Sequence, residues 1–274
     1  MVMDARPGLT RPGTQWLTVV AILIAVWGMA CDAQQTPTQK GRISIAADLE
    51  VERISDNIWR HISYEYLESF GRSSANGLVV VAGDEAVLVD TPWRDEQTAT
   101  LFDWVREELG ARVTTVVVTH SHPDNLGGLG EAHRRGSQSV AYEKTVAFAR
   151  DNGRVVPQLA VGASYDLSLD TLELELRLYG GGHTADNIVV WIPQENVLFG
   201  GCLVRSATTQ IMGYTEEADL ESWPVTLRRV LEQYGSREPI VVPGHGPPGG
   251  IELLEHTLEL LRGQERGEGQ PLDY

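Results

Sequence analysis

The chain has 274 residues, of which 42% are hydrophobic, and its formal net charge at pH 7 is −16. This hydrophobic content is enough for a sizeable core and excludes a chain that is disordered throughout, and the length suits one large domain or two small ones. The acidic excess argues against a nucleic-acid partner, because proteins that bind nucleic acids carry a basic face.

The first thirty residues have the pattern of a secretory signal peptide. Arg6 and Arg11 precede an apolar run at residues 17–27, and small residues follow it. The run is too short for a permanent membrane-spanning helix, which needs about 20 residues. A segment that is removed on export fits better. We therefore predict a signal peptide at residues 1–30 and an exported, periplasmic protein.

Cys31 follows the sequence Gly-Met-Ala at residues 28–30, which resembles the cleavage box of bacterial lipoproteins. In such a box the cysteine is acylated, so Cys31 would tether the protein to a membrane. Gly28 stands where a leucine is usual, and cleavage after Ala33 by the ordinary signal peptidase is the alternative. Residues 31–41 are polar and show no periodicity, which predicts a flexible tether.

The first half of the globular region alternates strand patterns with one helix pattern. Short runs rich in β-branched and aromatic residues predict strands at residues 49–53, 57–62, 77–82 and 86–89. An apolar face with helical spacing predicts a helix at residues 94–109. The continuous apolar run at residues 113–118 is typical of a strand that is buried on both faces.

The second half repeats this order loosely. Strands are predicted at residues 172–178, 187–192, 197–199 and 240–242, and helices at residues 220–234 and 251–261. Two halves of this kind predict one α/β domain at residues 42–263. We expect a four-layer αβ/βα sandwich, with two packed mixed sheets and the helices outside. The polar residues 264–274 are predicted to form a disordered tail.

The sequence His120-Ser121-His122-Pro123-Asp124 comes directly after the buried strand pattern. Two histidines separated by one residue point the same way if the backbone between them is extended, and Pro123 favours that conformation for His122. A third histidine would complete a zinc site with an open fourth position, which is the arrangement of catalytic zinc. Asp124 can serve a neighbouring ion.

Three further segments each place one zinc-type ligand beside glycines at the end of a predicted strand. These ligands are His183, Cys202 and His245. The only other cysteine is Cys31, so Cys202 has no intramolecular partner if Cys31 is acylated or removed. An unpaired thiol in an exported protein suggests a function such as metal ligation. Imidazole, thiolate and carboxylate together suit zinc better than magnesium or calcium.

In this order the motifs resemble those of the metallo-β-lactamase superfamily, over about residues 47–262. Asn125 stands where most hydrolases of the superfamily have a second histidine, and Cys202 stands where they have a bridging aspartate. This combination resembles the broad-spectrum di-zinc β-lactamases. The resemblance implies two Zn²⁺ per chain, one held by three histidines and one by an Asp-Cys-His set. The implied ligands are His120, His122 and His183 for the first ion, and Asp124, Cys202 and His245 for the second.

The resemblance also implies a reaction and a substrate. The reaction is zinc-dependent hydrolysis of the β-lactam amide bond of penicillins, cephalosporins and carbapenems, which confers antibiotic resistance. Asp124 would orient the nucleophile as well as bind metal, so we predict that it is catalytic. No covalent enzyme intermediate is needed, so Ser121 is not predicted to be a nucleophile.

The resemblance also implies four residues that contact the substrate. Arg205 stands where a lysine often pairs with the substrate carboxylate, and a guanidinium can do so with two parallel hydrogen bonds; a solvated surface arginine is the alternative. In the resembling enzymes an asparagine that helps to stabilise the developing oxyanion stands at the position of Tyr214. Here the first zinc or the phenol of Tyr214 would have to stabilise the oxyanion instead. Residues 63–75 correspond to a mobile hairpin over the substrate, where Tyr66 and Phe70 offer apolar contact or pack on the hairpin's own base.

Two other functions stay open from the sequence. The chain could be another hydrolase of this fold, acting on a lactone, thioester or phosphodiester, or an exported zinc-binding protein without activity. Asn125 and Cys202 argue against the first alternative, and the open fourth metal position argues against the second. A monomer is the default expectation for the oligomeric state.

Overall fold

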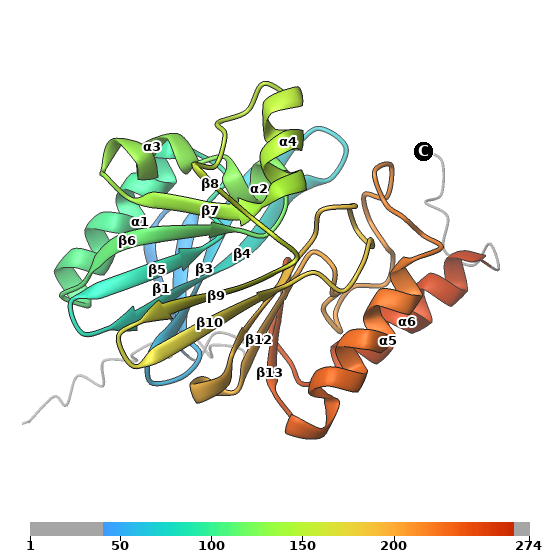
Figure 1. Ribbon diagram of the computed structural model, residues 1–274. Helices are drawn as coiled ribbons and strands as arrows, with labels where there is room; N and C mark the ends of the chain where they lie inside the picture. Colours follow the sequence, from blue (N-terminus) through green and yellow to red (C-terminus); the bar gives the residue numbers. More distant parts are fainter. Residues whose placement is uncertain (1–40, 266–274) are drawn as a thin grey trace, which may run out of the picture. The chain divides into compact units, whose positions relative to one another are not determined.

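The computed structural model describes residues 41–265 of the chain, and Figure 1 traces them from blue to red. The predicted signal peptide, Cys31, nearly all of the predicted tether and the last nine residues of the predicted tail lie outside these described residues. Within residues 41–265, none of the helices combines the length and the apolar character that crossing a membrane requires.

The first sheet has eight strands that lie side by side in the order in which they follow one another in the chain. Strands β1 to β5 pair in antiparallel fashion, and β5 to β8 pair in parallel. The strands are β1 (Arg42–Ala46), β2 (Leu49–Arg53), β3 (Ile58–Leu67), β4 (Gly71–Ala82), β5 (Glu85–Val89), β6 (Arg112–Val118), β7 (Gln138–Tyr142) and β8 (Leu159–Val161).

The second sheet has five strands in the order β13-β12-β11-β10-β9. All neighbours are antiparallel except β12 and β13, which run in parallel. Both sheets are therefore mixed, as predicted. The strands are β9 (Ser164–Leu169), β10 (Leu172–Arg177), β11 (Val189–Ile192), β12 (Val197–Gly201) and β13 (Ile240–Pro243).

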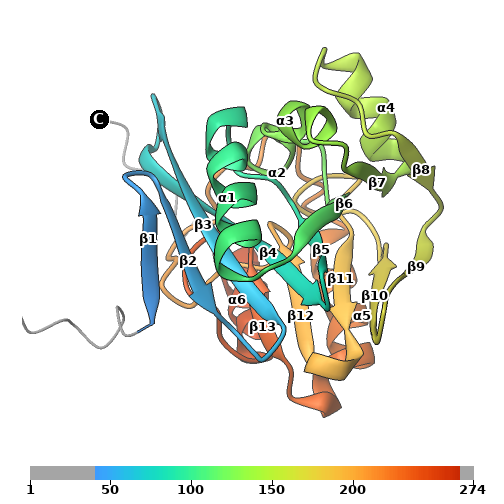
Figure 2. The ribbon, with the colours of Figure 1, turned by 90° about the vertical axis from the view of Figure 1, so that its left-hand side faces the viewer.

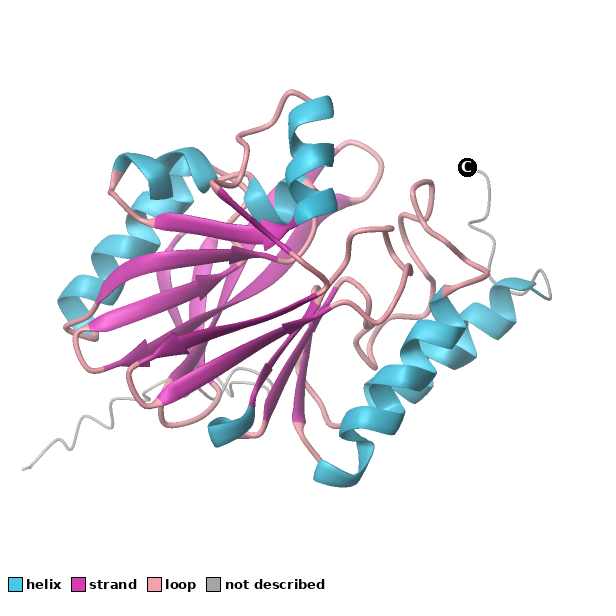
Figure 3. Ribbon diagram, in the orientation of Figure 1, coloured by secondary structure: helices cyan, strands magenta, loops and turns pink. Residues whose placement is uncertain are grey.

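Helices cover the outer face of each sheet. Figure 1 shows α1, α3 and α4 on one side of the paired sheets and α5 and α6 on the other. Figure 2 looks onto α1, which lies across the strands of the first sheet, and Figure 3 separates the helices from the strands by colour. The helices are α1 (Asp95–Glu108), α2 (Pro123–Leu126), α3 (Leu129–Arg134), α4 (Glu143–Asp151), α5 (Trp223–Tyr234) and α6 (Glu252–Glu265), with short 3₁₀ turns η2 (Pro193–Glu195) and η3 (Gly235–Arg237).

Three apolar cores hold these layers together. The first lies between the two sheets and contains Val117 and Phe199, and the second lies between the first sheet and its helices and contains Val116 and Leu101. The third joins the second sheet to α5 and α6. Adjacent residues of β6 thus belong to different cores, because side chains alternate across a strand. The four-layer sandwich and the strand buried on both faces are confirmed.

Several elements differ from the prediction in extent. Residues 63–75, which we expected to lie between strands, belong largely to β3 and β4. The two strands pair continuously, from Ile58 opposite Val80 to Leu67 opposite Gly71. Helix α5 begins at Trp223 and not at residue 220, because Pro224 has no N–H and fits only in a first turn. Helix α6 runs past residue 261 to Glu265. Strands β1, β7, β8 and β9 and helices α2 and α4 were not predicted.

Candidate metal centre

Six potential metal ligands come together from the ends of four strands in two sheets. His120 and His122 follow β6, and Asp124 lies in the short helix α2 that comes next. The other three follow strands of the second sheet, with His183 after β10, Cys202 after β12 and His245 after β13. They form two groups, one of three histidines and one of Asp124, Cys202 and His245, and in each group the ligand atoms lie within 4.8 Å of one another.

The first group has a spacing that suits a tetrahedral zinc ion. His122 Nδ1 lies 3.1 Å from His120 Nε2 and 3.1 Å from His183 Nε2, and all three residues are buried. Zn–N bonds of about 2.0–2.1 Å with tetrahedral angles separate two nitrogens by about 3.3 Å. His122 has the extended backbone that Pro123 was predicted to favour, with φ −77° and ψ 157°.

The second group offers three different ligand atoms at similar spacing. Cys202 Sγ lies 3.6 Å from Asp124 Oδ2 and 3.3 Å from His245 Nε2, and these last two atoms are 3.3 Å apart. Zinc bonds of about 2.3 Å to sulfur and about 2.0 Å to nitrogen or oxygen give separations of about 3.3–3.6 Å. Gly244 permits this approach, because a Cβ there would lie 2.4 Å from Cys202 Sγ.

Hydrogen bonds around the first group orient its loop. Asp90 accepts hydrogen bonds from the backbone N–H and the hydroxyl of Thr119, each at 2.7 Å, and from Asn125 Nδ2 at 2.7 Å. Thr119 Oγ1 in turn lies 3.4 Å from His120 Nδ1. Burial raises the pKa of Asp90 to about 7, although the three donors favour its ionised form. The chain of contacts directs His120 Nε2 toward the other two histidines.

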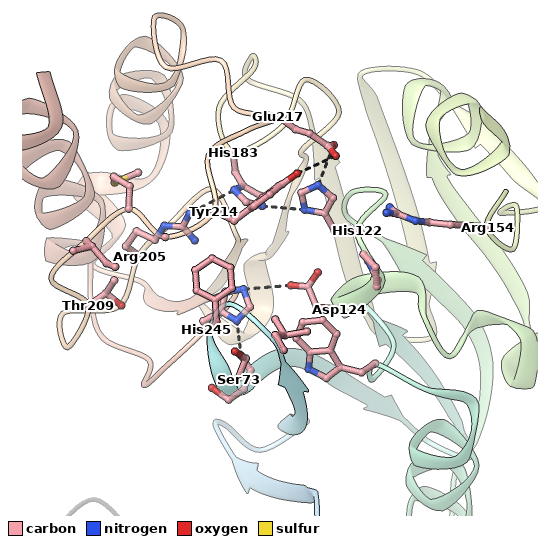
Figure 4. A pocket seen from close by; sticks show the side chains of 18 residues that line it. Ser73, His122, Asp124, Arg154, His183, Arg205, Thr209, Tyr214, Glu217 and His245 are labelled. Carbon is pink, nitrogen blue, oxygen red and sulfur yellow. Dashed lines mark hydrogen bonds and ion pairs between the residues drawn. The ribbon is translucent and has the colours of Figure 1, made fainter. Parts of the chain in front are cut away.

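The outer nitrogen of His122 faces a carboxylate at the pocket rim. His122 Nε2 lies 3.1 Å from Glu217 Oε2, and the Tyr214 hydroxyl donates to Glu217 Oε1 at 3.4 Å. The rings of Tyr214 and His122 meet edge to face, with centroids 5.7 Å apart. Figure 4 shows these three side chains together, beside His183 and above Asp124 and His245. A hydrogen bond at Nε2 leaves Nδ1 of His122 free as the ligand atom.

The loop that carries His245 is held by the first sheet, although β13 belongs to the second. His245 Nδ1 donates to the carbonyl of Ser74 in β4. Asn76 Nδ2 and Arg60 Nη1 donate to the carbonyl of Gly246 at 2.8 Å and 2.7 Å. These contacts join the two sheets at the metal centre and direct Nε2 of His245 toward Cys202.

The protonation states favour metal binding in the first group. Burial, reinforced by the charges of neighbouring histidines, lowers the pKa of His120 and of His183 well below the ordinary value, so both are neutral ligands at pH 7.

In the second group, burial alone would raise the pKa of Asp124, but the hydrogen bond and charge of His245 outweigh it and lower that pKa. Burial raises the pKa of the Cys202 thiol. A coordinated cation removes that proton, because a thiol bound to a metal is deprotonated.

A pocket of about 450 Å³ opens over both groups. His122 and His183 of the first group line it, and so do Asp124 and His245 of the second. Arg205 also lines it and is buried, with 7% of its surface exposed. Within the part of the chain that the structure describes, its guanidinium makes no ion pair, and Nη2 lies 3.5 Å from His183 Nδ1.

The structure places three of the four residues predicted to contact substrate at this pocket, namely Phe70, Arg205 and Tyr214. Tyr66 is not among the lining residues, and 75% of its surface is exposed. Alternation along β3 explains the difference, because the next residue, Leu67, faces the pocket. Other lining residues were not singled out from the sequence, including Arg154, Ile211, Met212 and Glu217. No motif marks them, since each reaches the pocket only through the fold.

Comparisons with known proteins agree with this arrangement. The family profile described as the Metallo-beta-lactamase superfamily matches residues 70–245. The metallo-beta-lactamase type 2 of Bacteroides fragilis is 38% identical over 89% of this chain and 95% of its own length, and that of Bacillus cereus is 35% identical over 84% and 89%. The structure of a metallo-beta-lactamase from Pontibacter korlensis is 40% identical, covers 79% of this chain and all of its own, and superposes with a TM-score of 0.76.

Proposed function

The chain belongs to the metallo-β-lactamase superfamily, and we propose that it hydrolyses the amide bond of β-lactams with two zinc ions per chain. It is a zinc-dependent hydrolase. The observation that carries the proposal is that two ligand groups of different composition, three imidazoles and an Asp-Cys-His set, open into one pocket. The substrates are penicillins, cephalosporins and carbapenems, so the activity would confer antibiotic resistance.

His120, His122 and His183 would hold one zinc ion and Asp124, Cys202 and His245 the other, and the bound zinc would supply an activated nucleophile at neutral pH and Lewis-acid polarisation of the lactam carbonyl. The residues of the chain position the substrate and the nucleophile around them. Asp124 lines the pocket, and its ionised carboxylate accepts a hydrogen bond from the attacking water and so orients it. Ser121 is buried and does not line the pocket, so it has no access to the carbonyl as a nucleophile.

Arg205 is the proposed partner of the carboxylate next to the lactam nitrogen. The phenol of Tyr214 donates its hydrogen bond to Glu217, so a zinc ion at the first group would stabilise the oxyanion. Tyr214 contacts the substrate through its ring. Phe70 at the tip of the β3–β4 hairpin lines the pocket and offers apolar contact to the substrate. Tyr66 contacts it only if the hairpin closes further.

The alternatives fit the site less well. Asn125 is buried and donates its amide to Asp90 Oδ2 at 2.7 Å, so it provides no metal ligand of the kind that a histidine at this position would supply. Cys202 takes the ligand position that a bridging aspartate holds in hydrolases of lactones, thioesters or phosphodiesters. An inert zinc-binding protein has no need of a pocket of about 450 Å³ above its metal ligands.

We further propose an exported, periplasmic and monomeric protein that is tethered to the membrane through acylated Cys31. The support is the signal-like pattern of residues 1–30 and the box before Cys31. Labelled palmitate should enter the wild-type protein but not the Cys31→Ala variant. Equal labelling of the two would refute the tether.

The function is tested with purified mature protein, a chromogenic cephalosporin and elemental analysis. We expect about two zinc ions per chain, turnover that a chelator abolishes, and recovery when zinc is returned. The Cys202→Ser variant should lose most of the activity and the second ion, whereas Ser121→Ala, a control on the same loop as the histidines, should retain both. Protein that holds two zinc ions but opens no β-lactam would contradict the proposed substrate class.

A further inference from the structure

We propose that Arg154 forms a second anion-binding subsite in the pocket, opposite Arg205, which favours β-lactams that carry an additional negative charge on the acyl side chain. The inference rests on the proposed function, because it names a preferred substrate group of the same site. It concerns a residue that no sequence motif marks and that reaches the pocket from the loop between α4 and β8.

The backbone of Arg154 is fixed by the end of helix α4. Gly153 adopts a left-handed conformation with φ 65°, and the N–H of Arg154 donates to the carbonyl of Ala149 at 2.8 Å. This is the hydrogen-bond pattern of a helix that ends on a glycine. The side chain of Arg154 therefore leaves a rigid point and needs no ordering of a loop before it can bind a ligand.

The guanidinium of Arg154 retains free donors at the pocket wall. Its Nη1 donates to the carbonyl of Ser121, between the two histidines of the motif. No ion pair with a carboxylate involves Arg154 within residues 41–265, and the residue is only half-buried. A guanidinium has five N–H donors, so one hydrogen bond to a carbonyl leaves most of them and the whole charge available.

Arg154 and Arg205 lie on different sides of the metal ligands. Arg205 contacts His183, whereas Arg154 contacts the backbone beside His122. Figure 4 shows the two guanidinium groups on opposite sides of these histidines. In a β-lactam the fixed carboxylate lies next to the ring nitrogen, and the acylamino group lies across the ring. A substrate whose carboxylate pairs with Arg205 therefore extends its acyl side chain toward Arg154.

No carboxylate of the described residues forms an ion pair with Arg154. Two carboxylates line the pocket: Asp124 lies beside Cys202 and His245, and the two oxygens of Glu217 face His122 Nε2 and the Tyr214 hydroxyl. The chain as a whole carries a formal charge of −16, which repels a doubly charged anion at long range. Two separate cations within the pocket counter this repulsion where the substrate binds, because fields from distant charges are screened within about 10 Å.

The test compares benzylpenicillin with its α-carboxy derivative, which differs by one carboxylate on the acyl side chain. In the zinc-loaded enzyme, Arg154→Gln should raise KM for the α-carboxy compound by about fivefold and leave KM for benzylpenicillin within twofold. Arg154→Lys should restore most of the preference, because it keeps the charge. Arg150→Gln is the matched control, since Arg150 lies on α4, is exposed and is not a lining residue, and it should change neither KM.

Zinc content and the cobalt absorption spectrum of each variant report separately on the metal ligands. A rise of KM by the same factor for both penicillins, or a changed spectrum in Arg154→Gln, would assign Arg154 to support of the His120–His122 loop and overturn the subsite. If Arg150→Gln raised KM for the α-carboxy compound as selectively as Arg154→Gln, the preference would come from long-range charge and the subsite would be refuted. If the wild-type enzyme hydrolyses neither penicillin with zinc present, the proposed β-lactamase function itself is refuted.

Discussion

Arg205 is a buried cation that forms no ion pair with a carboxylate among the described residues. Its Nε has no hydrogen-bond partner among the described residues, and its guanidinium lies 5.3 Å from the ring centroid of Trp223. Burial lowers the pKa of this group from a value far above neutral, so it stays charged. A buried charge without an opposite charge beside it destabilises the fold, and an anionic ligand that pairs with it removes this cost. This imbalance is the physical reason to assign Arg205 to the substrate carboxylate.

Replacing Arg205 with alanine should therefore weaken substrate binding more than it weakens the fold. We expect KM for benzylpenicillin to rise roughly tenfold to a hundredfold, which corresponds to the loss of one charge-assisted hydrogen-bonded pair. Steady-state kinetics and thermal unfolding of Arg205→Ala and Arg205→Lys measure the two effects, and the lysine variant should lie between alanine and wild type. An unchanged KM in Arg205→Ala would show that this arginine does not touch the carboxylate.

At the scale of elements, the β3–β4 hairpin has a fixed base and a free tip. Arg94, just before α1, forms ion pairs with Asp48 and with Glu65, and Gln97 Nε2 donates to the carbonyl of Tyr64 at 2.9 Å. Beyond residue 65, β3 and β4 pair only with each other as far as the turn. The part of the hairpin that can move over a substrate is therefore the tip beyond residue 65.

The tip should contribute apolar contact from one face only. Phe70→Ala is expected to raise KM for bulky cephalosporins by about fivefold, because part of one aromatic side chain loses its contact with the substrate. Tyr66→Ala, on the outward face, should change KM by less than twofold. Michaelis constants for the two variants decide the matter, and an equal rise would mean that closure of the hairpin turns Tyr66 onto the substrate.

At the scale of the whole molecule, the interior contains a histidine, His61, that belongs to neither group of candidate metal ligands. His61 in β3 is fully buried, and its Nε2 lies 3.0 Å from the carbonyl of Asp90. Burial lowers the pKa of His61 from 6.5 to about 4. The neutral ring is therefore the form that the fold accepts, and protonation favours the unfolded chain.

The sign of this effect predicts a loss of stability in acid. The contribution of His61 is complete above pH 6.5 and is lost as the pH falls toward 4, so it should remove about 2 kcal/mol between pH 7 and pH 5. Urea unfolding of wild type and His61→Gln, both with excess zinc, measures the difference between the two pH dependences. Identical pH dependences would show that His61 does not titrate in this range.

Local sequence patterns were sufficient to predict much of the fold and all of the candidate metal ligands. The run at residues 113–118 predicted a strand buried on both faces, and the order of strands and helices predicted two mixed sheets between helices. The six ligand candidates were also evident, because three lie in the His-x-His-x-Asp sequence after a strand pattern and His183, Cys202 and His245 each lie beside a glycine after another. Strands β7, β8 and β9 were not, and it is pairing with neighbouring strands of the two sheets that defines them.

Residue types and their spacing along a few neighbouring positions were thus enough to predict the layers and the chemistry of the metal ligands. The pocket around these ligands depends on the folded chain. There Tyr66 faces outward, Arg205 is buried with no ion pair among the described residues, and Arg154 and Glu217 reach the rim. These outcomes depend on contacts between segments far apart in the chain, such as Arg154 with Ser121, and no local periodicity records which distant backbone a side chain will meet.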